Sequence, residues 1–223
     1  MVLKWRKLLA CVWLVFYERF STNVFKRNGK LEAYPTMRFT ETNIQDTWLI
    51  EPERHSDERG HFARTWCVSE FKERDLNSQL VQCNVSFNKR AGTLRGMHFQ
   101  SAPAEEAKLV RCTRGRIYDV VADIRPDSPT YLQWQAFDLS AKNQAALYIP
   151  EGCAHGFQAL LDDTEVFYQM SEFFDAESAN GFHHADRQIG IGWPMTISMI
   201  SEKDQQLPQF SELSLKQPLA DVA

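Results

Sequence analysis

KLVRCTRGRIYDVVADI, residues 108–124, contains two runs rich in valine, isoleucine and leucine, with Thr113-Arg114-Gly115 between them. β-branched residues favour strands, and a short break that contains glycine favours a tight turn. The stretch therefore predicts a hairpin whose strands cover residues 108–112 and 116–124.

Similar short runs recur on both sides of this stretch, with turn-forming residues between them. The strongest helix signal is residues 68–76, with Ser69 as its candidate cap. Many short strands with little helix are typical of an antiparallel sandwich or barrel. We expect the polar tail from Ile197 to wrap its surface. The remaining predicted strands are residues 47–50, 62–66, 80–87, 133–139, 146–149, 156–161 and 165–171.

The composition is that of one globular domain. Of the 223 residues, 43% are hydrophobic and 24% are charged, which excludes disorder over most of the chain. The formal net charge is −4, without the basic excess that nucleic-acid binding usually needs. No repeat or linker divides the chain. We therefore predict a single domain over residues 37–223, with no nucleic-acid partner.

Residues 1–36 are expected to be an N-terminal extension of that domain. Lys4, Arg6 and Lys7 precede an apolar run, residues 8–17, which is similar to part of a signal peptide but lacks a clean cleavage site. The run is too short to span a bilayer, which takes about 20 residues. We expect either a poorly packed, disordered extension or an upstream start codon wrongly chosen, with Met37 as the real beginning. No membrane partner is expected.

The cysteines indicate a reducing compartment. They lie at Cys11, Cys67, Cys83, Cys112 and Cys153, and no pair has the short C-x₂-C spacing of a zinc site. An odd number of scattered cysteines favours reduced, mostly buried thiols over disulfides. We therefore predict a cytoplasmic protein.

Three β-rich segments concentrate the reactive side chains. Arg95 and His98 lie in residues 92–100, Lys108 follows Glu106 by two positions, and His155 comes just after a turn. Tyr168 lies on a later strand. Taken singly, each of these residues also fits an ordinary structural role, such as a half-buried strand residue.

A metal site is poorly supported by the histidines. The strand sequence His98-Phe99-Gln100 lacks the second histidine of a metal-binding pair, and His183 and His184 would point to opposite sides of an extended segment. The glycine patterns of phosphate loops and dinucleotide sites, and the G-x-S-x-G nucleophile elbow, are also missing.

Taken together, nine segments resemble the dTDP-4-dehydrorhamnose 3,5-epimerase family, in order and spacing, from about Thr40 to Pro208. The resemblance implies an all-β, cupin-type jelly roll with a few short helices, which acts without metal or other cofactor. It also implies a homodimer and a nucleotide-sugar substrate, a 4-keto-6-deoxyhexose used in dTDP-rhamnose or other deoxysugar and polysaccharide synthesis. The segments are residues 94–100, 108–112, 115–121, 123–125, 128–130, 148–152, 154–158, 191–194 and 201–204.

The same resemblance implies a catalytic set whose chemistry is reasonable. A 4-keto group acidifies the hydrogens on C3 and C5, and inversion needs a base on one face and an acid on the other. The family base matches His98, a neutral imidazole at physiological pH. Asp204 would fix its tautomer, Tyr168 would return the proton from the opposite face, and Lys108 would stabilise the enolate oxygen.

Substrate-binding residues follow from the same resemblance, with some departures from the family pattern. Phe173 and Phe174 replace tyrosines, so Phe174 keeps the stacking on thymine but not the hydroxyl. Arg64 and Ala179 replace glutamates, and Glu106 stands where a glutamine is common. The positions that match family contacts to the nucleotide or the sugar are Arg59, Gln82, Asn84, Arg95, His155, Phe174 and Lys203.

These departures leave more than one function open. The leading interpretation is an isomerase that converts dTDP-4-keto-6-deoxy-D-glucose to dTDP-4-keto-L-rhamnose by epimerisation at C3, C5 or both. The alternatives are a single-carbon epimerase of a related sugar, a metal-dependent cupin oxygenase, and a sugar-nucleotide sensor without catalysis.

Overall fold

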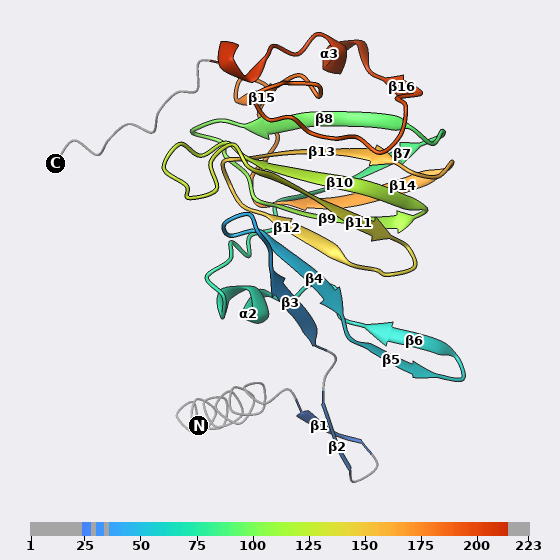
Figure 1. Ribbon diagram of the computed structural model, residues 1–223. Helices are drawn as coiled ribbons and strands as arrows, with labels where there is room; N and C mark the ends of the chain where they lie inside the picture. The colour runs from blue at the N-terminus through green and yellow to red at the C-terminus, as the bar shows by residue number, and fades with distance from the viewer. Residues whose placement is uncertain (1–23, 28–29, 34–35, 214–223) are drawn as a thin grey trace, which may run out of the picture. The chain divides into compact units, whose positions relative to one another are not determined.

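The computed structural model of this chain describes residues 24–27, 30–33 and 36–213 (Figure 1). These residues form two compact units. The first contains the described residues up to Met37 together with Pro52–Thr65, and the second contains Arg38–Glu51 and the chain from Trp66 onward. Within the described ranges, no helix is both long enough and apolar enough to cross a membrane.

The first unit consists of two antiparallel pairs of strands. One pair is β1 (Val24–Arg27) with β2 (Lys30–Ala33), and the other is β5 (Arg54–Asp57) with β6 (Gly60–Ala63). The strand predicted over residues 62–66 is therefore shifted to β6. Residues 1–23 of the predicted extension lie outside the described residues, and its boundary at Met37 stays a prediction.

The second unit contains two six-stranded sheets built from antiparallel pairs, with β16 (Met199–Ile200) added in parallel to β8. In order, the first sheet consists of β11 (Trp134–Ser140), β10 (Arg116–Asp123), β13 (Cys153–Ala159), β8 (Thr93–Gln100) and β15 (Ala179–Gly181), with β16 beside β8. The second consists of β3 (Met37–Glu41), β4 (Trp48–Pro52), β12 (Ala146–Ile149), β9 (Lys108–Arg114), β14 (Thr164–Met170) and β7 (Gln82–Asn88).

The main core lies between these two sheets, which face each other in Figure 1. Ile117 and Val121 of β10 are two of its members from the first sheet, and Val110 and Leu147 are two from the second. Alternate residues of a strand point to the same face, and the core is formed mainly by inward-facing residues of β9 to β14. The predicted antiparallel sandwich is confirmed.

The hairpin predicted for residues 108–124 is wrong, although both of its strands exist. β9 pairs with β12 and β14, while β10 pairs with β11 and β13, so the turn at Gly115 carries the chain from one sheet to the other. Gly115 has φ = 81°, and a Cβ there would lie 2.3 Å from Thr164 Oγ1. Both hydrogen-bonding edges of each strand are already occupied, so the two runs cannot also pair with each other.

The outer face of the first sheet is covered by the C-terminal part of the chain. Met97 and Val120 on that face pack with Phe182, Phe210 and Trp193 in a second hydrophobic cluster. The tail predicted to wrap the surface does so as far as the described residues extend: β16 pairs with β8, and Phe210 lies in η1 (Phe210–Glu212). Its helix α3 (Glu202–Gln205) begins after Ser201, whose Oγ accepts a hydrogen bond from the Asp204 N–H at 3.0 Å.

The predicted helix at residues 68–76 is present but shorter. Helix α2 (Val68–Lys72) begins after Cys67, and no side chain caps it, so the capping role predicted for Ser69 is wrong. The Ser69 hydroxyl instead lies 3.0 Å from Cys67 Sγ. The helix is held by packing, since Phe71 is buried against the ring of Tyr148.

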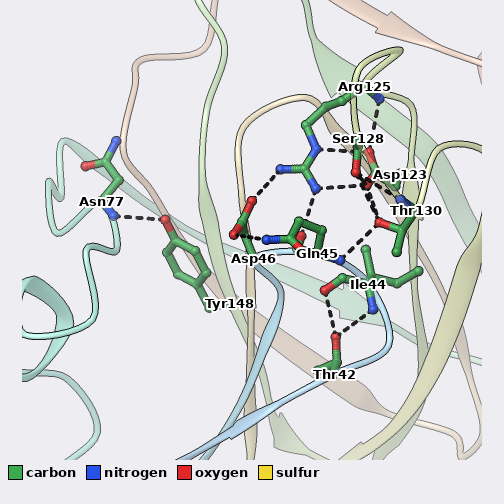
Figure 2. Close-up of polar contacts among 10 residues, drawn as sticks. All are labelled: Thr42, Ile44, Gln45, Asp46, Asn77, Asp123, Arg125, Ser128, Thr130 and Tyr148. Atoms are coloured by element: carbon green, nitrogen blue, oxygen red, sulfur yellow. Dashed lines mark hydrogen bonds and ion pairs between the residues drawn. The ribbon is translucent and has the colours of Figure 1, made fainter.

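A buried carboxylate connects two loops of the second unit (Figure 2). Asp123 accepts hydrogen bonds from Arg125 at 2.9 and 2.8 Å, from Ser128 at 2.5 Å and from Thr130 at 2.6 Å. Arg125 also reaches Asp46 at 3.0 Å on the other loop. Burial alone would raise the pKa of Asp123, but the donors from Arg125, Ser128 and Thr130 hold it below its ordinary value.

The described cysteines are all free thiols. Cys112 and Cys153 are buried, and burial raises the pKa of Cys112 to about 11 and that of Cys153 to about 12. Cys83 is exposed and Cys67 is partly exposed, so the expectation of mostly buried thiols holds for two of these four. Cys11 lies outside the described residues.

Candidate active site

A cavity of about 750 Å³ opens in the second unit, lined by side chains from both sheets and from the C-terminal segment. Every site residue predicted from the sequence lines it, except Arg59. The first sheet contributes Arg95, His98 and His155, the second contributes Gln82, Asn84, Lys108 and Tyr168, and the remaining predicted members are Phe174, Lys203 and Asp204.

Strand alternation explains how the second sheet builds its wall. On β14, Val166 and Tyr168 are two positions apart and share the inner face; Val166 joins the core, and Tyr168 packs on the core and lines the cavity. Tyr168 is the cross-strand partner of Asn84 on β7, while Met170 is the partner of Lys108 on β9. The polar lining is therefore the continuation of the apolar core along the same strands.

The backbones of β8 and β13 approach each other closely, and their irregular pairing lets Arg95 and His98 of β8 both line the cavity. In a regular strand, two residues three positions apart would point to opposite faces. Arg95 and His98 are three positions apart, and the pairing between β8 and β13 shifts register between His155 and Phe157. Gly96 has φ = 123°, and a Cβ there would lie 2.5 Å from the Gly156 Cα. Only glycine fits this position, and the irregularity brings both side chains into the cavity.

His98 is oriented by a carboxylate from the end of the described chain. Its Nε2 lies 2.8 Å from Asp204 Oδ1, and Asp204 is nearly inaccessible. Burial would raise the pKa of Asp204, but the hydrogen bond and charge of His98, together with the Gly96 N–H, hold it below its ordinary value. An ionised carboxylate can only accept, so Nε2 carries the hydrogen and the lone pair of the neutral imidazole is on Nδ1.

A second histidine–carboxylate pair lies beside the first. His155 is the direct cross-strand partner of His98, and its Nε2 is 2.8 Å from Oδ1 of the fully buried Asp119 on β10. Sequence reasoning missed Asp119. The available signal was a carboxylate at an inward position of an otherwise apolar strand, where an unpaired charge would be very unfavourable.

Lys108 and Tyr168 supply the polar groups of the opposite wall. Lys108 Nζ forms an ion pair with Glu106 Oε1 at 2.6 Å, and both side chains are largely buried. Burial raises the pKa of Tyr168, and the positive charge of Arg95 offsets only part of this effect. Tyr168 therefore keeps its phenolic proton at neutral pH and is available as a proton donor.

The residues predicted to bind the nucleotide are only partly brought together. Phe174 is exposed at the cavity, and its N–H donates to Gln82 Oε1 at 3.2 Å. Lys203 lines the cavity from helix α3. Arg59 belongs to the first unit, where its exposed guanidinium pairs with Asp57 at 2.5 Å in the turn between β5 and β6.

Among the described residues, no group of three or more histidine, cysteine, aspartate or glutamate side chains could hold a metal ion. His183 and His184 do not point to opposite sides. Their ring centroids lie 4.3 Å apart, because a turn from His183 to Asp186 replaces the extended segment.

Comparison with known proteins gives consistent results. Residues 41–212 match the family model described as dTDP-4-dehydrorhamnose 3,5-epimerase. A protein of that name from Sinorhizobium fredii is 42% identical over 178 residues, 79% of this chain and 91% of the relative. A dTDP-4-dehydrorhamnose 3-epimerase from Streptomyces niveus is 38% identical, and the match covers 76% of this chain and 82% of that relative. The crystal structure of dTDP-4-dehydrorhamnose 3,5-epimerase from Bacillus anthracis, with TDP and PPi bound, is similar with a TM-score of 0.75 and 40% identity, covering 78% of this chain and 99% of that one.

Proposed function

The chain belongs to the dTDP-4-dehydrorhamnose 3,5-epimerase family, metal-independent isomerases with the cupin jelly-roll fold, and from this premise we propose how its cavity catalyses the reaction. The substrate is dTDP-4-keto-6-deoxy-D-glucose, and the product of inversion at both carbons is dTDP-4-keto-L-rhamnose.

The observation that carries the proposal is the placement of a base and an acid on opposite sheets. His98 lines the cavity from β8 and Tyr168 lines it from β14. A sugar ring between the two sheets would present one face to the imidazole and the other to the phenol. This is the arrangement that inversion of a carbon centre needs.

The neutral imidazole of His98 can accept a proton, and the protonated phenol of Tyr168 can donate one. The lone pair of His98 takes the proton from C3 or C5, and the electrons of the broken C–H bond move to the keto oxygen to form an enolate. The Lys108 ammonium stabilises that oxygen. Tyr168 gives its proton to the opposite face of the carbon, and the tyrosinate and the imidazolium return to their starting states by exchange with solvent.

The nucleotide part is proposed to bind through the polar residues of the second sheet and the C-terminal segment. The Bacillus anthracis relative binds TDP. Gln82 and Asn84 offer hydrogen bonds, Phe174 offers an exposed ring for stacking on the base, and Lys203 offers charge for phosphate oxygens. Arg59 of the first unit is proposed as a further phosphate contact. Arg95 and His155 are proposed to contact the sugar.

A homodimer is part of the proposal. Its test is the mass in solution, which should be twice 25.8 kDa by sedimentation equilibrium. A mass of 25.8 kDa at micromolar concentration would contradict it.

The experiment that tests the function is incubation with dTDP-4-keto-6-deoxy-D-glucose in D₂O, analysed by NMR and mass spectrometry. Deuterium at both C3 and C5, lost in His98→Ala, is the expected result. Deuterium at one carbon would favour a single-carbon epimerase, the activity named for the Streptomyces niveus relative. Binding without any deuterium incorporation would contradict catalysis on this sugar and support a sensor.

A further inference from the structure

The segment that carries Phe174 has no regular secondary structure, yet its backbone is held at three consecutive residues. The Phe174 N–H donates to Gln82 Oε1 at 3.2 Å. Gln100 binds the neighbour on each side: its Nε2 donates to the Phe173 carbonyl at 3.1 Å, and its Oε1 accepts from the Asp175 N–H at 2.8 Å. The backbone is therefore fixed on both sides of the Phe174 ring.

The amide of Gln100 is fully used by these backbone contacts. Gln100 is the last residue of β8, lines the cavity and is 4% exposed. Its Nε2 also donates to the Ala104 carbonyl at 2.6 Å. Two carbonyl groups can face only the NH₂ end of an amide, so both of its hydrogens are engaged and its orientation is fixed. Gln100 has no N–H left to donate to a ligand.

The ring of Phe174 is fixed through its backbone and not by packing in a core. Phe173 and Phe174 are 62% and 58% exposed, and of these two rings Phe174 lines the cavity. An exposed aromatic side chain on a loose segment would lose conformational freedom when a base stacks on it, and that loss weakens binding. Hydrogen bonds that fix the segment in advance remove part of the loss.

We propose that Gln100 is a positioning residue that acts through Phe174: by binding the backbone on both sides of this residue, its amide holds the ring in place to stack on the base of the nucleotide sugar. This inference rests on the proposed function, because it takes Phe174 to be the stacking residue. It predicts an effect on affinity for ligands that contain a base, with little effect on proton transfer.

The first test measures the affinity for dTDP and for pyrophosphate by calorimetric titration. The structure of the Bacillus anthracis relative contains TDP and PPi, and only the nucleotide has a base. Gln100→Met replaces the amide by an apolar group of similar length. We expect its Kd for dTDP to rise roughly tenfold, and its Kd for pyrophosphate to change less than about twofold. Gln188→Met, the same change at an exposed residue, should bind both ligands as the wild type does.

A double-mutant cycle shows whether the effect passes through the ring. Phe174→Ala should weaken dTDP binding roughly tenfold or more, and Gln100→Met in that background should cause little further loss. Additive losses would overturn the proposal. With dTDP-4-keto-6-deoxy-D-glucose, KM should rise in Gln100→Met while kcat changes less than about twofold. A fall in kcat with an unchanged Kd would also overturn it, because that result would place the effect at His98, two positions away on β8.

Hydrogen exchange tests the proposal in the wild-type protein, so this test does not depend on the folding of a variant. The Asp175 amide should exchange slowly before dTDP is added, because Gln100 already accepts its hydrogen. In Gln100→Met the same amide should exchange faster. Fast exchange in the ligand-free wild type, slowed only when dTDP binds, would overturn the proposal.

The binding measurements separate this inference from the proposed function. If the wild-type protein bound no dTDP, the proposed nucleotide-sugar function would fail and this inference would fail with it. Binding of dTDP by the wild type with an unchanged Kd in Gln100→Met would refute the inference alone.

Discussion

At the residue scale, the chemistry of the cavity depends on which imidazole nitrogen carries the hydrogen. Asp204 Oδ1 accepts from Nε2 of His98, and this places the lone pair on Nδ1. Because the pKa of Asp204 is held below its ordinary value, the carboxylate persists at mildly acidic pH, where an ordinary aspartate begins to protonate.

Asp204→Asn therefore tests the tautomer. An amide NH₂ can donate to Nε2 and would favour the imidazole form whose lone pair is on the wrong nitrogen. We expect kcat for deuterium incorporation to fall by about 10³–10⁴-fold with little change in fold. Glu202→Gln, an exposed acid on the same helix, is the control. Retention of activity within threefold in Asp204→Asn would contradict the tautomer argument.

The individual site residues could be identified from sequence only in part. His98, Lys108, Tyr168 and Asp204 were found through family motifs, and all four line one cavity. Their partners were harder to find, because pairing is a property of the fold. Asp119 contacts its histidine across 36 positions, so its apolar strand sequence can show that the carboxylate needs a partner but not which residue that partner is.

At the element scale, the irregular crossing of β8 and β13 positions the side chains of the first sheet. It depends on Gly96 and Gly156, whose backbones approach too closely for a Cβ. The pattern of apolar residues cannot reveal this crossing, since it reports which face is buried but not where two strands slip in register.

Gly96→Ala should disturb both the stability and the site. Its Cβ would lie 2.5 Å from the Gly156 Cα and 2.9 Å from the His155 oxygen, at a φ of 123°. We expect a loss of roughly 3 kcal/mol in the free energy of unfolding. Activity should fall at least about 100-fold as Arg95 and His98 are displaced. Gly192→Ala, where no atom lies within 4 Å of the new Cβ, should leave both properties unchanged in urea unfolding and kinetic assays.

The hydrogen bonds to the Asp123 carboxylate should make the free energy of unfolding depend on pH. In the folded state the pKa of Asp123 lies below its ordinary value, so the carboxylate contributes stability that is fully present above about pH 4 and is lost as pH falls through the folded value. Asp123→Asn should lower the free energy of unfolding by about 3 kcal/mol at pH 7, because Arg125 and two hydroxyl donors lose their acceptor.

The measurement is the unfolding temperature of Asp123→Asn and of the wild type between pH 2.5 and 7. The gap between them should narrow as pH falls, because the wild-type carboxylate becomes protonated. Asp127→Asn, an exposed aspartate of the same loop, should follow the wild type throughout. A gap that stays constant over the whole range would contradict the assignment.

Element boundaries show where sequence reasoning works and where it stops. Residues 146–149 were predicted as a strand and form β12 with the same bounds. For residues 108–124 both strands are predicted correctly, but their pairing with each other is not. Which strand becomes a neighbour depends on the hydrogen-bonding edges that the rest of each sheet leaves free, and β9 and β10 pair with other strands. The prediction that Ser69 caps a helix is wrong for a related reason. Helix α2 is stabilised by the packing of Phe71 and not by a side-chain cap.

At the scale of the whole molecule, the residues predicted from sequence to act on the substrate do not all belong to one compact unit. The proposed catalytic residues belong to the second unit, and Arg59 belongs to the first. Chemistry and nucleotide affinity should therefore be separable by mutation.

Arg59→Ala should raise KM for the dTDP-sugar roughly tenfold, as expected for the loss of one charge-assisted hydrogen bond to phosphate, and change kcat less than about twofold. Steady-state kinetics with Arg54→Ala, on the same hairpin, provides the comparison. A fall in kcat with KM unchanged would show that Arg59 acts on the reaction rather than on nucleotide binding.

The distance in sequence between His98 and Asp204, 106 positions, has a consequence for how activity arises during synthesis. A ribosome makes His98 and the strands around it well before it reaches the helix that carries the carboxylate. Until Asp204 has been translated and α3 has docked, the growing polypeptide holds an imidazole without its partner. The same reasoning applies to degradation: loss of the chain from α3 onward would remove the proposed partner of His98 while leaving most of both sheets intact.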